Sequence, residues 1–116
     1  MADYAEEVSL KDVKLNDRWI GIGTIGPVTV NGDTPGNALT RVRMVFRLGQ
    51  SLFTLDSADG EITIDDADTW KASIAAMDTF LPRDGLWSWE MEFFWSGATS
   101  PWTLFYGQIR CHPELV

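Results

Sequence analysis

Cysteine and histidine are almost absent from this 116-residue chain, which has one of each, Cys111 and His112. A single cysteine excludes an intramolecular disulfide, so the fold must be stabilised by packing. A zinc site would need carboxylates for most of its ligands. Adjacent residues on an extended segment point to opposite faces, which disfavours a Cys-His nucleophile. We therefore expect neither a metal ion nor a cofactor.

Long apolar runs are also lacking. A membrane-spanning helix needs roughly 20 apolar residues, and no run in this sequence approaches that length. The first seven residues, Met1 to Glu7, are acidic and lack the basic and apolar regions of a secretory signal. We expect no signal peptide and no transmembrane segment, and we interpret residues 1–7 as a flexible N-terminal tail.

Basic residues are scarce, with nine Lys and Arg against 17 Asp and Glu and a formal net charge of −8. This charge would repel both a phosphate backbone and anionic lipids. We therefore predict that the chain binds neither nucleic acid nor membranes. Hydrophobic residues, at 45%, and charged residues, at 22%, have the balance of a globular protein. The length suits one domain, which we expect to span residues 8–116.

Strict alternation of apolar and polar residues is the dominant pattern in two long segments. In the first, the apolar face consists of Trp87, Trp89, Met91, Phe93 and Trp95; in the second, it consists of Val42, Met44, Phe46 and Leu48. A period of two predicts half-buried strands, because successive side chains of a strand point to opposite faces. We expect Met44, Phe46, Trp87 and Trp89 to lie in the core.

Shorter β-prone runs, each bounded by turn residues, are Trp19–Ile22, Leu52–Leu55, Glu61–Ile64 and Trp102–Cys111. Asp59-Gly60 indicates a tight hairpin turn. Segment 70–77 fits both a short helix and a strand, and we predict a strand because Thr69, Trp70 and Ser73 suit extended backbone. About seven or eight strands favour an all-β fold, an immunoglobulin-like antiparallel sandwich of two sheets, with a small barrel as the alternative.

Two groups of acidic residues are candidate sites of chemistry. Glu90 and Glu92 share one strand face, and glycoside hydrolysis uses paired carboxylates. We interpret them instead as residues of a solvated face that pair with arginines of segment 41–47 if the two strands are neighbours. The acidic run 65–68 lacks the spacing of a calcium loop and is interpreted as a solvated turn. Since nucleophile-elbow and nucleotide-binding motifs are also lacking, we expect no enzyme and no catalytic residues.

Aromatic residues exceed what the core alone requires. Phe94 falls on the polar face beside Glu92, and Trp102 follows Pro101 at the start of a strand. Buried aromatic residues dominate the energetics of protein contacts. We therefore predict Phe94, Trp95 and Trp102 as interface residues. Binding of a sugar by stacking on these same rings is the alternative hypothesis.

The order of features along residues 18–114 resembles a known family. The segments that carry the resemblance are Thr40–Arg47, Leu55–Ile64, Trp70–Ile74, Leu81-Pro82, Trp87–Glu92, Tyr106–Ile109 and His112–Glu114. They resemble small immunoglobulin-like proteins of tailed bacteriophages and prophages, related to the N-terminal domain of the upper baseplate protein family. The resemblance implies a virion structural protein of the tail, neck or baseplate, made in the host bacterial cytoplasm. It also implies binding to other tail or baseplate proteins and allows a homo-oligomer.

Overall fold

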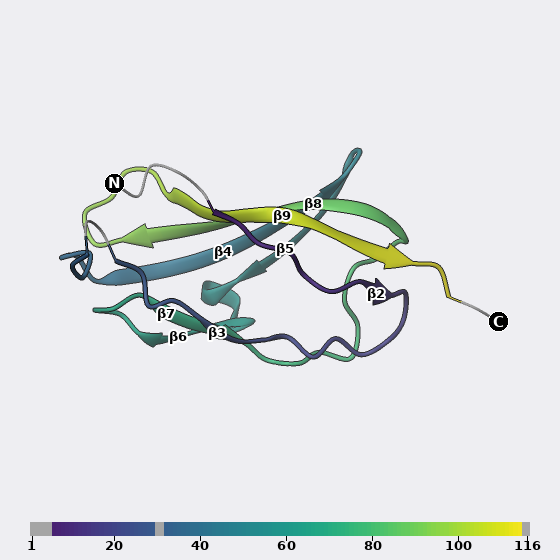
Figure 1. Ribbon diagram of the computed structural model, residues 1–116, viewed down its shortest axis with the longest axis horizontal. Helices are drawn as coiled ribbons and strands as arrows, with labels where there is room; N and C mark the ends of the chain where they lie inside the picture. The colour runs from purple at the N-terminus through teal and green to yellow at the C-terminus, as the bar shows by residue number, and fades with distance from the viewer. Residues whose placement is uncertain (1–5, 30–31, 115–116) are drawn as a thin grey trace.

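The computed structural model describes residues 6–29 and 32–114, and it shows an all-β sandwich of two sheets (Figure 1). The strands are β1 (Glu6–Glu7), β2 (Val13–Lys14), β3 (Ile22–Ile25), β4 (Leu39–Leu48), β5 (Ser51–Asp56), β6 (Ile62–Asp66), β7 (Lys71–Ile74), β8 (Gly85–Trp95) and β9 (Trp102–His112). The larger sheet has the order β1-β9-β8-β4-β5, with β2 also paired to β9, and the smaller sheet has the order β3-β7-β6. The predicted all-β, two-sheet fold is confirmed.

Pairing between the long strands is antiparallel, as predicted, but β1 and β2 run parallel to β9. Residues 1–5 of the predicted tail lie outside the described residues. Glu6 and Glu7, however, form β1 opposite Phe105 and Tyr106, so the prediction of a tail reaching residue 7 is wrong. Both acidic side chains are exposed. Their backbone groups can therefore pair with β9 at no cost of burying charge.

The alternating segments place their apolar faces inward, where they form the core. Trp87, Trp89, Met91 and Phe93 of β8 are buried, as are Val42, Met44 and Phe46 of β4. All four predicted core residues are therefore confirmed. The two strands are neighbours, with Met44 opposite Met91 and Phe46 opposite Trp89. Cross-strand packing of large side chains at successive positions stabilises this pair without a covalent link.

The ambiguous segment contains strand β7, as predicted. Ala72 and Ile74 point into the core next to Trp70, whose indole Nε1 donates to the carbonyl oxygen of Asn37 at 2.7 Å. The strand ends at Ile74, and Ala76 is exposed. Within residues 6–29 and 32–114, no helix has the length and hydropathy needed to cross a membrane.

Two local predictions are wrong. The predicted strand Trp19–Ile22 begins only at Ile22, because Gly21 has a φ of 77° and Trp19 pairs with Met77 alone. The predicted hairpin at Asp59-Gly60 is instead a 3-10 helix, η1 (Ser57–Asp59), that connects β5 of the larger sheet to β6 of the smaller sheet. The side chain of Asp56 caps this helix, and Gly60 ends it in the left-handed conformation.

Candidate functional site

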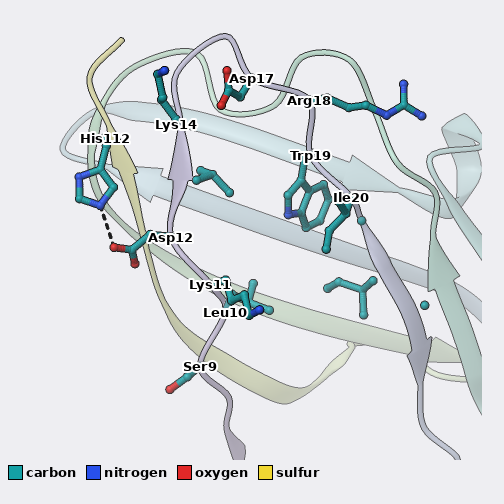
Figure 2. A pocket seen from close by; sticks show the side chains of 14 residues that line it. Ser9, Leu10, Lys11, Asp12, Lys14, Asp17, Arg18, Trp19, Ile20 and His112 are labelled. Carbon is teal, nitrogen blue, oxygen red and sulfur yellow. Dashed lines mark hydrogen bonds and ion pairs between the residues drawn. The ribbon is translucent and has the colours of Figure 1, made fainter. Parts of the chain in front are cut away.

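A cleft of about 730 Å³ opens along one side of the sandwich (Figure 2). One wall is formed by residues 9–14, which the larger sheet holds through the pairing of β2 with β9. The other wall is formed by residues 17–23, which lead into β3 of the smaller sheet. The two walls are connected to different sheets, and among the described residues they are not hydrogen-bonded to each other as strands.

Ile20 is the outstanding residue of this cleft. Its side chain is 81% exposed, the largest value among the exposed large apolar residues of the described chain. The neighbouring Trp19 is buried and stacks on Phe80, with ring centroids 3.9 Å apart, which fixes the wall that carries Ile20. Leu10 and Ile22 add apolar lining. The cleft therefore presents an apolar side chain to solvent beside a buried, stacked tryptophan.

A smaller cavity of about 180 Å³ shares Leu10 and Ile22 with the cleft and reaches Trp89, Met91 and Phe105 of the larger sheet. The side chain of Trp89 is buried, and its Nε1 has no hydrogen-bond partner among the described residues. This neighbouring cavity is therefore lined mostly by apolar residues, with one indole N–H that lacks an acceptor among the described residues.

The rim of the cleft is polar and carries charges of both signs. Nε2 of His112 lies 2.7 Å from Oδ2 of Asp12, as the dashed line in Figure 2 marks. Arg18 extends away from the cleft and donates to Oδ1 of Asp78 at 2.7 Å. Both pairs are well exposed, so each contributes little to stability.

Cys111 and His112 lie on opposite faces of β9, as predicted, with the cysteine buried and the histidine exposed. Burial raises the pKa of the Cys111 thiol above its ordinary value, and the nearby charge of Asp84 acts in the same direction. A thiol that resists ionisation in this way is a poor nucleophile. Cys111 and His112 are therefore residues at the end of β9 that are not arranged as a nucleophile and its base.

The three predicted interface residues lie on two different faces of the larger sheet. Phe94 is on the outer face, where the guanidinium carbons of Arg41 and Arg43 lie 5.1 and 5.3 Å from its ring centroid. These distances are within the range of cation–π contacts. Phe94 is therefore in contact with arginines of its own chain, and the structure does not bring it together with Trp95 and Trp102.

Trp95 and Trp102 lie on the inner face, at one end of the sandwich. Their ring centroids are 4.8 Å apart, and both rings contact Trp70 at 5.8 and 6.0 Å. Both side chains are half-buried and pack against the core. The structure therefore unites these two predicted interface residues in one tryptophan cluster, Trp70, Trp95 and Trp102, in which part of each ring surface is already covered.

The acidic residues considered as sites of chemistry have structural contacts. Glu92 lies opposite Arg43, and its Oε1 accepts hydrogen bonds from that guanidinium at 2.8 Å, as predicted for neighbouring strands. Glu90 lies opposite Val45 and is exposed. In the acidic turn, Oδ1 of Asp66 accepts from the backbone N–H groups of Asp68 and Thr69, and these bonds lower the pKa of Asp66. Within the part of the chain that the structure describes, no group of three or more His, Cys, Asp or Glu is placed to hold a metal ion.

Sequence reasoning did not identify Ile20 as a functional residue. The predicted strand 19–22 placed it next to the inward-facing Trp19, and alternation would have directed it outward. That signal was available, but nothing in the sequence shows that residues 9–14 form a second wall facing it. Comparison with protein-family models finds no match, and neither does comparison with curated proteins or with solved structures.

Proposed function

We propose that this chain is a non-enzymatic structural protein of a bacteriophage or prophage virion, a component of the tail, neck or baseplate that binds other virion proteins. The host bacterial cytoplasm is then its site of synthesis. The order of features along the sequence supports the viral assignment, and the cleft of Figure 2 supports the binding role.

The observation that carries the binding role is the exposed Ile20 side chain on the cleft wall. Scattered apolar residues on a protein surface need no explanation. An aliphatic side chain beside an apolar cleft is different, because a partner that fills the cleft removes both surfaces from water. Leu10 and Ile22, which line the same cleft, extend the apolar surface available for such a contact.

The viral assignment is tested in the bacterium that carries the gene. Tailed particles are purified through a density gradient, and the chain is quantified by mass spectrometry. The expected result is a fixed number of copies per particle, with particle assembly lost when the gene is deleted. Complete and infective particles that lack the chain would contradict the proposal.

The role of the cleft is tested in the same particles with Ile20→Asp. Thr63→Asp is the matched control, since Thr63 is exposed on β6 and lies outside the cleft lining. Both variants are expected to fold with unchanged stability, because neither side chain is buried. Incorporation into particles should fall at least about tenfold for Ile20→Asp, which corresponds to loss of one apolar anchor. Equal incorporation of the two variants would remove the cleft from the proposal.

Sugar binding on the surface aromatic residues has less support. A stacking platform needs an open ring face, whereas Trp95 and Trp102 contact each other and Trp70. Phe94 has two guanidinium groups near its ring. We therefore retain protein binding as the proposed function.

A further inference from the structure

The outer edge of β5 has backbone groups with no neighbour strand. β5 is the last strand of the larger sheet and, among the described strands, pairs only with β4. At its end, the N–H of Asp56 donates to Oε1 of Glu61 at 3.1 Å, and the carbonyl of Asp56 accepts from the N–H of Glu61 at 3.3 Å. Both backbone groups of Asp56 therefore face away from β4.

Leu52 and Thr54 direct their backbone groups to the same free side as Asp56, because residues of an antiparallel pair alternate in the direction of their N–H and C=O groups. Among the described residues, no group outside the β4–β5 pair bonds to the backbone of Leu52 or Thr54. Both side chains are exposed, Leu52 at 58%. Two donors and two acceptors are thus left open on one short stretch of strand.

This edge lacks the features that usually prevent strand-to-strand association. Lysine, proline and bulges are the common protective devices. β5 reads Ser-Leu-Phe-Thr-Leu-Asp, and its pairing with β4 continues without a register shift. The edge strands of the smaller sheet differ, because both β3 and β6 pair with β7 through a register shift.

Charges are distributed unevenly along β5. At its start, Arg83 donates to Oγ of Ser51 at 2.8 Å, and Arg47 lies opposite Leu52 on β4. At its end lie the exposed Asp59 and the half-buried Glu61. If a second copy of this strand runs antiparallel to the first, the basic end of each copy meets the acidic end of the other. The edge is thus complementary to itself, although the chain as a whole carries a net charge of −8.

We propose that two copies of the chain form a symmetric dimer by antiparallel pairing of β5 with β5. The two-fold axis passes between the Phe53 residues of the two copies. Leu52 of each copy pairs with Thr54 of the other copy through their free backbone groups. The two larger sheets then form one continuous sheet. This inference goes beyond the virion role, since it concerns self-association and holds equally outside a particle.

The decisive variant is Thr54→Pro, which removes the outward N–H while an edge strand tolerates proline at such a position. Thr54→Ser, which keeps that N–H, is the matched control. Sedimentation equilibrium of the full chain over a wide concentration range should show a reversible dimer for wild type and Thr54→Ser. Thr54→Pro should raise the dissociation constant about tenfold or more while the near-UV circular dichroism of the tryptophans stays native. A wild-type chain that stays monomeric at every concentration, or a Thr54→Pro chain that dimerises normally, would overturn the proposal.

A charge exchange provides a second test that leaves the backbone of β5 unchanged. Arg83→Glu and Asp59→Arg should each weaken the dimer, because each places like charges at the ends that meet. An equimolar mixture of the two variants restores opposite charges at both contacts of the heterodimer, and the double variant restores them in its homodimer, so both should regain wild-type affinity. Failure of the double variant to recover would contradict the antiparallel arrangement. Gene-deletion experiments on particles bear on the virion role alone, so the two proposals fail separately.

Discussion

Nε of Arg41 donates to Oδ1 of Asp56 at 2.9 Å, across two neighbouring strands of the larger sheet. Asp56 is the one charged residue among the buried side chains of the described chain, and the same Oδ1 accepts from the N–H of Ala58 at 3.0 Å. A single carboxylate thus joins β4, the end of β5 and the helix η1 that leads to the smaller sheet. This carboxylate therefore holds the start of the connection between the two sheets.

Asp56→Ala should destabilise the protein by roughly 1–3 kcal/mol. The substitution removes hydrogen bonds to a charged group and the cap of η1, but exposure of the guanidinium reduces the contribution of the ion pair. Urea unfolding followed by tryptophan fluorescence measures the loss. Asp59→Ala is the control, because Asp59 is a nearby exposed acid with no hydrogen-bonded partner among residues 6–29 and 32–114, and it should change stability by less than about 0.5 kcal/mol. An equal effect of the two substitutions would assign the loss to local charge rather than to the Asp56 contacts.

The same carboxylate should make stability depend on pH. The hydrogen bond from Arg41 and that from Ala58 hold the pKa of Asp56 below its ordinary value of 3.8. The unfolded chain therefore binds a proton at Asp56 at a higher pH than the folded chain does. This contribution is complete above the unfolded pKa and is lost as pH falls through that value to the folded pKa. Asp56→Asn should flatten the fall in urea midpoint below about pH 5 relative to wild type, and an unchanged slope would contradict the assignment.

The larger sheet could be predicted from the sequence because its strands alternate strictly. The apolar faces of β4 and β8 contain few exceptions, so periodicity alone identifies which side chains are buried. Periodicity leaves segment 70–77 ambiguous, and the strand there is predicted from residue types that suit extended backbone. Its extent is not predicted, because β7 ends two residues before Ala76, which is exposed.

Strand β1, the link at Asp59-Gly60 and the cleft depend on contacts that cannot be predicted from local sequence patterns. β1 forms because β9 is long enough to offer a free edge to Glu6 and Glu7, a relation between residues about 100 positions apart. The link at Asp59-Gly60 has the sequence of a hairpin, yet Asp56 caps a helical turn there and the chain enters the other sheet. The cleft is likewise formed by two segments that are connected to different sheets.

Gly107 should be essential for attachment of the N-terminal segment. A Cβ at this position would lie 2.3 Å from the carbonyl oxygen of Val8 and 3.2 Å from Nε1 of Trp89, so alanine forces the residues before β2 away from β9. Gly107→Ala should therefore cost about 1–3 kcal/mol, the range of strained core substitutions. Gly23→Ala is the control, because a Cβ there meets no atom within 4 Å. Hydrogen exchange should show faster exchange at the N–H of Val8 in Gly107→Ala only; slow exchange there in both variants would contradict this account.

Substitution of Trp102 distinguishes protein binding, the proposed function, from sugar binding, the alternative. The ring is half-buried against Trp95 and Trp70, so Trp102→Ala should lower stability by roughly 1–3 kcal/mol, less than the 3–5 kcal/mol of a fully buried tryptophan. Phe94→Ala, which loses only outer-face contacts with two arginines, should cost about 1 kcal/mol or less. Chemical denaturation measures both. On a glycan array, wild type and both variants should show no specific retention, since the ring faces are engaged within the chain. Specific retention by wild type that disappears in Trp102→Ala would favour sugar binding, because it would show that the Trp102 ring takes part in the contact with the glycan.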